Sequence, residues 1–506
     1  MSPLARLLAV LLCALSVPAA AADDSRPVFL EIEAERVDLE LLSAHGDIDG
    51  VFPGRVRLYA RPEAVARLRD LGFAVTVLPD PGLNPGARMD LAERAPQGQW
   101  DAYPTWSGYV AMMQALADTY PHLCRLVDLG PTTNLVRPHR LLALKISDHP
   151  GADEDEPEVF LTSTMHGDET VGFVTLLRFA DELLRLHDPA SSDPEIQRIT
   201  RLVDEVEIWI NPLANPDGTY YASDGSVNGA IRYYTTASGG NSGKDPNRNF
   251  PDPQDGPPPT IWGETQRMMD FQAARRIDLA ANYHGGAEVV NYPWDTWARL
   301  HADDAWYRLI SHAYADQAQA DGPAGYMDGF DDGITNGYAW YEVDGSRQDW
   351  TNYYAAGREV TIEVSNQKNP PAANLPTFWQ ANRLALVGFV EQALAGVRGV
   401  VLDGCERPVA ATVKGLGHDL DHSEVRPDPA VGDYHRLLAP WVYALRFEGA
   451  DFAPVEVSGV VVDGGAATRV DLSVVLAAGP IFCDGFEAGG AGRWSGHSPC
   501  STGRPE

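Results

Sequence analysis

Between residues 100 and 396 the sequence alternates between short apolar runs and longer amphipathic segments. The short runs have the length and composition of buried strands, at 140–146, 158–162, 208–212, 280–284 and 360–364. The segments 109–120 and 171–186 have the apolar spacing of helices. This alternation predicts an α/β fold, with a mixed sheet covered by helices. Because ligands gather at the carboxyl ends of strands in such sheets, the polar residues that end several runs are candidate site residues.

Two smaller units are expected on either side of this domain. Residues 23–80 read as strands at 28–32, 56–59 and 74–78 with a helix at 62–71, which predicts a small α+β unit. A turn-rich linker follows at 81–99, where an exposed and protease-sensitive connection is expected. Residues 397–477 alternate between short strands and turns, which predicts a small all-β sandwich, and residues 478–506 form a Gly-rich tail.

The first 22 residues have the pattern of a secretory signal peptide. Arg6 precedes an apolar stretch at 7–15, and four alanines stand before Asp23. That stretch is too short to span a bilayer, and no later segment approaches the necessary length, so a secreted protein is expected, either extracellular or periplasmic. Beyond the signal lie four cysteines, an even number in an oxidising compartment, and Cys483 with Cys500 is the expected bridge.

The charge of the chain excludes some partners. A formal net charge of −32 repels nucleic acid and anionic lipid, and no run of Lys and Arg offers a local exception. Nucleic acid is therefore not expected as a partner, and no integral membrane segment is expected.

Three residues at strand ends suggest a metal site. His166 and Glu169 follow the strand at 158–162, just before the helix at 171–186, so that both can point at one ion. His284 ends the strand at 280–284. A catalytic zinc ion needs three ligands of this kind and an open position for water. The pair alone is weak evidence, since His and Glu at this spacing are common on surfaces.

Longer strings carry a resemblance to a known family. The order of His166, Glu169, Asn247-Arg248, His284, Tyr341 and Glu363 resembles the zinc carboxypeptidases of the carboxypeptidase A/B type. The strings 282–295 and 336–350, followed by 363–365 and Pro370-Pro371, resemble the N/E regulatory subgroup in particular. The region 397–477 is similar to the transthyretin-like domain that follows the catalytic domain in that subgroup, most clearly at 432–438.

The resemblance implies a role for each catalytic residue. It makes His166, Glu169 and His284 the ligands of Zn²⁺ and Glu363 the general base that activates water. Arg232 is the candidate for stabilising the developing oxyanion, although the subgroup usually has this Arg closer to the Asn-Arg pair.

Other residues match the positions that bind substrate in the family. Asn247, Arg248 and Tyr341 match those that hold the free C-terminal carboxylate, for which an Arg fork is well suited. Asp295 lies where the members specific for basic residues place an acid in the side-chain pocket, and Gln348 also matches their pattern.

The expected function is therefore that of a secreted zinc metallocarboxypeptidase that hydrolyses the last peptide bond of peptides or proteins with a free C-terminus, releasing Lys or Arg. Arg347 stands beside Gln348 where the subgroup has an apolar residue, and it would repel a basic side chain if it pointed into the pocket. Two alternatives stay open: a zinc hydrolase of cell-wall peptides or acyl groups on the same fold, and a non-catalytic binding protein.

Overall fold

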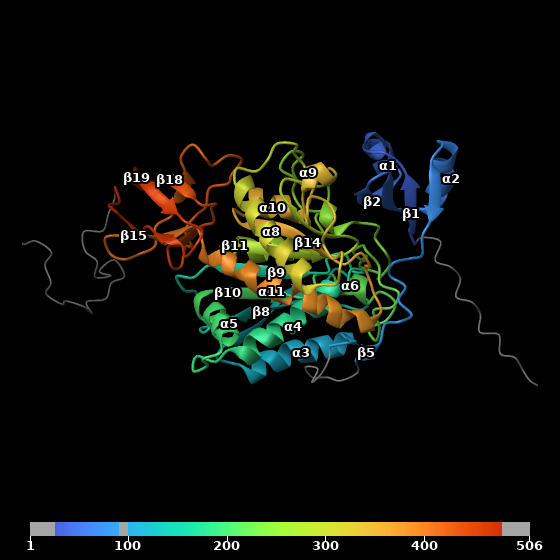
Figure 1. Ribbon diagram of the computed structural model, residues 1–506, viewed down its shortest axis with the longest axis horizontal. Helices are drawn as coiled ribbons and strands as arrows, with labels where there is room; N and C mark the ends of the chain where they lie inside the picture. The colour runs from blue at the N-terminus through green and yellow to red at the C-terminus, as the bar shows by residue number, and fades with distance from the viewer. Residues whose placement is uncertain (1–25, 91–99, 478–506) are drawn as a thin grey trace, which may run out of the picture.

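The computed structural model describes residues 26–90 and 100–477. Figure 1 shows a central domain with a smaller unit on either side. The expected signal at 1–22, linker residues 91–99 and the tail at 478–506 lie outside the described residues.

An eight-stranded mixed sheet forms the centre of the molecule. Its strands, in spatial order, are β13 (Ile334–Asn336), β12 (Glu288–Tyr292), β14 (Arg358–Val364), β11 (Ile277–His284), β9 (Glu158–Ser163), β10 (Glu207–Asn211), β8 (Arg140–Ile146) and β7 (Cys124–Pro131). The four central strands β14, β11, β9 and β10 run parallel to one another. The expected α/β class is confirmed.

The central strands are buried along their whole length. Every residue of β9, β10 and β14 is buried, as expected for parallel strands covered on both faces. Alternate residues of β9 face opposite layers, since Val159 and Leu161 join one apolar core whereas Phe160 packs against Phe271, with ring centroids 4.8 Å apart.

Helices supply both covering layers. One apolar core contains side chains of α3 (Trp106–Thr119), α4 (Val171–Leu186), α5 (Pro194–Glu205), α8 (Asp304–Asp321) and α11 (Leu375–Glu391). The second core contains side chains of α7 (Gly263–Ala273) and α10 (Arg347–Tyr353). Capping side chains fix where several helices begin. At the start of α3, for example, the Thr105 hydroxyl accepts a hydrogen bond from the Gly108 amide, 3.1 Å away. No helix within the described ranges is long and apolar enough to cross a membrane.

The N-terminal unit is a four-stranded antiparallel sheet with short helices. Its strands, in spatial order, are β2 (Gly46–Phe52), β3 (Arg55–Ala60), β1 (Val28–Glu33) and β4 (Ala74–Val77), and its helices are α1 (Leu39–Ser43) and α2 (Pro62–Asp70). The apolar core of this unit continues into the central domain, where it includes Val289, Trp340 and Val343. The unit therefore packs directly on the central domain.

Residues 81–90, the described part of the predicted linker, differ from the exposed connection that the turn residues predicted. Asn84 is only 3% exposed, and its side-chain amide donates hydrogen bonds to Asn369 Oδ1 (3.0 Å) and to the Pro370 carbonyl oxygen (2.7 Å). Its backbone amide donates to Asn228 Oδ1 at 2.7 Å. Further on, β5 (Met89–Asp90) pairs with β6 (Tyr103–Pro104). Turn residues here form specific polar contacts with the central domain instead of a free connection.

The C-terminal region forms two small sheets around a shared apolar core. One sheet contains β17 (Asp433–Arg436), β15 (Val397–Asp403), β20 (Thr468–Arg469) and β21 (Leu472–Val474). The other contains β16 (Thr412–Gly415), β18 (Trp441–Gly449) and β19 (Phe452–Val462). Cys124 is a buried free thiol and Cys405 forms a disulfide, whereas the expected pairing of Cys483 with Cys500 lies outside the described residues.

A buried charge network joins this sandwich to the central domain. Asp303 accepts hydrogen bonds from Arg436 of the sandwich (2.8 and 2.9 Å) and from Arg358 at the start of β14 (2.8 Å). Arg436 also pairs with Asp419. All of these side chains are almost completely buried, so each charge depends on its partners.

Candidate metal centre and active site

The corner between β9 and α4 holds two of the candidate metal ligands. Thr164 adopts a left-handed backbone conformation with φ of 60°, and its hydroxyl donates a hydrogen bond to the carbonyl oxygen of Glu169 at 2.8 Å. This contact holds residues 164–169 in a tight turn, in which the side chains of His166 and Glu169 contact each other. The His166 Nδ1 atom lies 2.9 Å from Glu169 Oε1.

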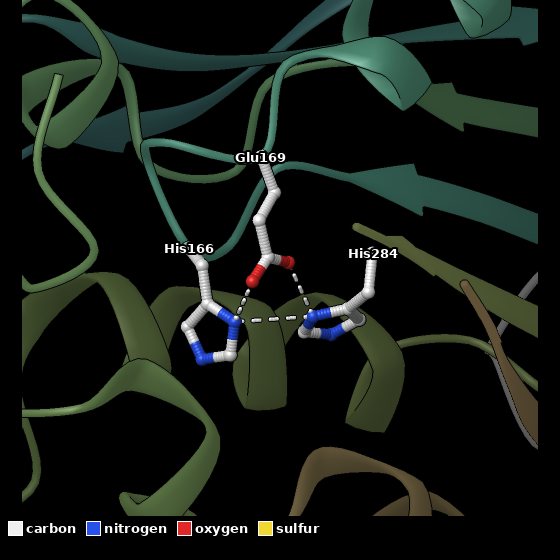
Figure 2. A group of neighbouring side chains, drawn as sticks. All are labelled: His166, Glu169 and His284. Atoms are coloured by element: carbon white, nitrogen blue, oxygen red, sulfur yellow. Dashed lines mark hydrogen bonds and ion pairs between the residues drawn. The ribbon is translucent and has the colours of Figure 1, made fainter. Parts of the chain in front are cut away.

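The third candidate ligand comes from the neighbouring parallel strand. Tyr283 of β11 is in register with Ser163 of β9, so His284 at the end of β11 emerges beside the corner. Its Nδ1 atom lies 2.8 Å from Glu169 Oε2 and 3.1 Å from His166 Nδ1. Figure 2 shows the two imidazoles facing each other below the Glu169 carboxylate. The three side chains predicted as metal ligands therefore converge.

The donor set fits a catalytic zinc ion. Two imidazoles and one carboxylate are typical ligands of such sites, and in tetrahedral geometry their donor atoms lie about 3.3 Å apart, close to the separations seen here. Burial lowers the pKa of His284 to about 4, so its imidazole is neutral near pH 7 and can offer a lone pair to a metal. All three residues are at most 3% exposed, which leaves the ligands little freedom.

A second layer of contacts orients His166. Its Nε2 atom lies 2.9 Å from Asp245 Oδ1, while Asp245 Oδ2 accepts hydrogen bonds from the Arg232 guanidinium at 2.9 and 3.0 Å. Burial disfavours the ionised form of Asp245, but Arg232 and His166 together hold the pKa of this carboxyl well below its ordinary value. Such carboxylate–histidine pairs fix the orientation of a metal-binding imidazole.

Glu363, the predicted general base, lies next to His284. The two residues are register partners on the adjacent strands β14 and β11, and Glu363 lines the same cavity as the candidate ligands. Its Oε2 atom is buried with no hydrogen-bond partner among the described residues. Burial, and then the negative charge of Glu169, raise the pKa of Glu363 well above its ordinary value. A group with a raised pKa suits proton transfer at neutral pH.

The remaining predicted residues, with one exception, line this cavity as well. They are Arg232, Asn247, Arg248, Asp295 and Tyr341. Gln348 stands behind Asp295, to whose Oδ1 atom its side-chain amide donates a hydrogen bond at 3.1 Å. Burial raises the pKa of Asp295 to about 6, and the carboxyl is only 2% exposed.

Arg347 points away from the cavity. Its guanidinium pairs with Glu359 Oε2 at 3.1 Å, contacts the Thr162 hydroxyl and lies over the Phe160 ring, with the guanidinium carbon 5.1 Å from the centroid. The side chain is 1% exposed and its charge is matched locally. The repulsion that its sequence position suggested does not arise from this geometry.

Two charged residues at the site were not predicted. Lys368 donates hydrogen bonds to Glu169 Oε1 at 2.6 Å and to the Gly285 carbonyl oxygen at 3.1 Å. Asp49 of the N-terminal unit pairs with Arg232 Nη1 at 2.8 Å and with Lys368 Nζ at 2.6 Å. Lys368 lies between Ser365 and Pro370, which both belong to segments that carried the resemblance, and this position was the only signal that the sequence offered for it.

A β-bulge explains how Asp49 reaches the site. In the pairing of β2 with β3, Ile48 lies opposite Leu58 and Gly50 opposite Arg57, so Asp49 is an extra residue. Bulges re-aim side chains in this way and are frequent beside active sites. Here the bulge turns a carboxylate toward the guanidinium of Arg232.

The same strand also occupies the predicted carboxylate-binding groups. Arg248 Nη2 donates a hydrogen bond to the Ile48 carbonyl oxygen at 3.2 Å, and the Tyr341 hydroxyl donates to the Asp49 carbonyl oxygen at 3.2 Å. Nearby, the Tyr233 hydroxyl donates to Asp47 Oδ2 at 2.8 Å. β2 therefore contacts Arg248 and Tyr341, two of the three residues that were predicted to bind a substrate carboxylate.

Comparisons with known proteins agree with this geometry. Residues 109–385 match the zinc carboxypeptidase family. The chain is 31% identical over 399 residues to the carboxypeptidase N catalytic chain of Mus musculus, a match that covers 72% of this chain and 83% of that protein. It is 32% identical over 357 residues to carboxypeptidase D of Rattus norvegicus, covering 66% of this chain but only 25% of that protein, so it spans about a quarter of that relative.

A solved structure has a similar fold. The crystal structure of thrombin activatable fibrinolysis inhibitor (TAFI) superposes with a TM-score of 0.55 at 15% sequence identity, covering 72% of this chain and 98% of that chain. The likeness of fold, the converging donor set and the family match over more than half of the chain lead to one conclusion. This chain belongs to the zinc carboxypeptidase family.

Proposed function

We propose that this protein is a secreted zinc carboxypeptidase that removes C-terminal Lys or Arg from peptides or proteins. The observation that supports this specificity is the buried carboxyl of Asp295, which lines the same cavity as His166, Glu169, His284 and Arg248. A cavity with a guanidinium for a terminal carboxylate and a carboxyl for a side chain suits a basic last residue.

The similarity of residues 397–477 to a transthyretin-like domain stays a prediction.

Substrate binding would begin with the free C-terminus. The Arg248 guanidinium can grip a carboxylate with two parallel hydrogen bonds, and Asn247 and Tyr341 offer further donors at the same wall of the cavity. An internal peptide segment has no such carboxylate, so this arrangement favours removal of the last residue.

Catalysis would use three kinds of group around the scissile bond. His166, Glu169 and His284 would hold a zinc ion, which would supply a Lewis acid and lower the pKa of a bound water. Glu363 takes the proton from the attacking water and later delivers it to the leaving amine. Arg232 stabilises negative charge that develops on the carbonyl oxygen.

We also propose that the N-terminal unit keeps the enzyme latent. The contacts of β2 engage Arg232, Arg248 and Tyr341 together, and no substrate terminus can use these groups while Asp49 and Ile48 hold them. The contact of Asp49 with Lys368 adds a second buried ion pair. Displacement of β2 from the cavity would therefore precede turnover.

The proposed function is tested with peptides that differ only in their last residue. The full-length, zinc-loaded protein and its Asp49→Ala variant are incubated with peptides ending in Arg, Lys, Phe or Ala, and mass spectrometry follows the products. We expect single-residue release, fastest for Arg and Lys. Faster release of Phe would refute the role of Asp295. Acylated and cell-wall peptides are assayed in parallel, and turnover of these substrates alone would support the other hydrolase. No turnover of any substrate by either the wild type or the Asp49→Ala variant would support a binding protein.

A further inference from the structure

The amino ends of the central parallel strands carry carboxylates side by side. Glu158 starts β9 and Glu207 starts β10, and the two are direct register partners. On the other side of β9, Asp278 is the second residue of β11, and its Oδ2 atom accepts a hydrogen bond from the Glu158 amide at 3.0 Å. Like charges placed opposite each other on neighbouring strands destabilise a sheet unless something neutralises them.

Other segments add to this concentration of charge, which we name the amino-end acidic cluster. It surrounds a small cavity between the central domain and the sandwich, lined by eight carboxyl side chains: Asp153, Glu154, Glu156, Glu158, Glu207, Asp278, Asp428 and Asp433. The cavity is also lined by Arg276, Arg426 and His435. The acids therefore come from the loop before β9, from the strand starts and from the C-terminal sandwich.

The nearby cations do not match the acids in number. Lys145 Nζ pairs with Glu207 Oε2 at 2.6 Å and with Asp153 Oδ1 at 3.4 Å. Arg275 contributes an electrostatic interaction with Glu158, and Arg469 pairs with Asp155 at 2.7 Å outside the cavity lining. Together with Arg276 and Arg426, these side chains leave the cluster with an excess of negative charge.

A buried carboxylate oxygen points to a missing partner. Glu158 is 7% exposed, and its Oε2 atom has no hydrogen-bond partner among the described residues. The Oε2 atom of Glu156, beside it in the cavity, is likewise buried without a hydrogen bond in the described part of the chain. A carboxylate oxygen that is buried without a partner is costly, so native proteins rarely leave one in that state.

The oxygen atoms are spaced as a bound cation requires. Asp153, Glu158 and Glu207 each offer one ligand atom, and these atoms lie within 4.8 Å of one another. Calcium binds oxygen at about 2.3–2.6 Å, so two of its ligands are at most about 5 Å apart.

We propose that Asp153, Glu158 and Glu207 bind a calcium ion at the amino ends of β9 and β10. An all-oxygen set of carboxylates suits a hard cation such as calcium, in contrast to the imidazole-containing group at the other end of the strands. Five residue steps separate Glu158 from Ser163 along β9, so the two sites are roughly 16 Å apart along the strand. The ion would fix the loop before β9 against the sheet and stabilise the docking of the sandwich.

Calcium binding to the zinc-loaded, full-length protein tests this proposal. Isothermal titration calorimetry with CaCl₂, after dialysis against calcium-free buffer and with zinc content checked, should give a saturable site in the wild type. Because ligand binding stabilises the folded state, calcium should also raise the Tm. Glu158→Gln should weaken calcium binding about tenfold or more and abolish the rise in Tm. Asp153→Asn, at an exposed position, provides a second variant with little risk to folding.

Matched controls make the result decisive. Glu63→Gln removes a carboxylate from an exposed position of α2 and should leave calcium binding unchanged. Absence of calcium binding by the wild type, or unchanged affinity in both cluster variants, would overturn the proposal. Neither readout depends on peptide hydrolysis, so failure here is distinguishable from failure of the proposed carboxypeptidase function.

Discussion

The two ends of the central parallel strands bury charge in different ways. At the carboxyl ends, the carboxylates of Glu169, Asp245 and Asp49 each face an ammonium or guanidinium group, either Lys368 or Arg232. At the amino ends, the acidic cluster has too few cations for its eight carboxyl side chains. The first arrangement gathers charges of both signs around the site that we propose for catalysis. The second is a concentration of negative charge that suits a spherical cation.

Each end also carries one flanking unit, and the units lie on opposite sides of the central domain (Figure 1). The N-terminal unit inserts Asp49 among the groups proposed for catalysis, while the sandwich contributes Asp433 to the acidic cluster and Arg436 to the Asp303 network. Changes at the N-terminal contact should therefore alter turnover, and changes at the C-terminal contact should alter stability.

The largest expected effect is at the carboxyl ends, from Glu363→Gln. Loss of the proton acceptor should lower kcat/KM by about 10³–10⁴-fold, while zinc content stays the same because Glu363 is not one of the converging ligands. The comparison is made in an Asp49→Ala background, by release of C-terminal Arg. Glu342→Gln, an exposed neighbour of Tyr341, is the control. Near-normal turnover of Glu363→Gln would rule out its role as base.

Asp295→Ala should change specificity more than general activity. Losing one partner of a buried charge pair costs about 2–5 kcal/mol, so the preference for Arg over Phe should fall by at least about 30-fold. Since the pKa of Asp295 is raised to about 6, the carboxylate is ionised above this pH and protonated below it. The Arg preference of the unmodified enzyme should therefore decline between pH 7 and pH 5. An unchanged preference in the variant would contradict the pocket assignment.

Asp49→Ala should raise activity. Removing this carboxylate frees Arg232 and Lys368 from β2 and weakens the hold of the N-terminal unit on the cavity, for which we expect a gain in kcat/KM of about tenfold. Asp38→Ala, an acid of the same unit in the short turn at Arg36–Asp38, serves as the control. Equal activity of the Asp49→Ala variant and the wild type would argue against latency.

The smallest effect on turnover is expected for Arg436→Met. This change leaves part of the charge of Asp303 buried without its partner and should lower the free energy of unfolding by about 3–5 kcal/mol. It should leave kcat/KM for C-terminal Arg unchanged at temperatures where the protein stays folded. Arg446→Met breaks only the partly exposed pairs with Glu448 and Glu456, so it should cost no more than about 1 kcal/mol. Thermal unfolding and kinetic measurements on both variants would show whether a change near the amino ends of the strands alters stability and leaves turnover unchanged.

Sequence reasoning located the candidate metal ligands because each stands at the end of a strongly apolar strand. It also predicted β1, β3, β4 and α2 of the N-terminal unit, whose residues alternate clearly between apolar and polar. It missed β2, because Gly46, Asp47, Asp49 and Gly50 have low strand propensity. The strand forms through tertiary pairing, and only that pairing brings its bulged carboxylate to the cavity.

The amino-end acidic cluster was beyond sequence reasoning for a related reason. Glu158, Glu207 and Asp278 are far apart along the chain, and each taken alone resembles a solvated acid at the start of a strand. Only the parallel register of the three strands makes them neighbours. Similarly, the turn residues of 81–90 predicted exposure, but nothing local revealed the polar contacts that bury Asn84.

The central claim is that one zinc ion binds between His166, Glu169 and His284. Crystals of the full-length, zinc-loaded protein, measured on both sides of the zinc absorption edge, test it most directly. The account predicts a strong anomalous peak among the two imidazoles and the carboxylate, lost in His284→Ala. A peak located elsewhere, or one that persists unchanged without His284, would contradict it.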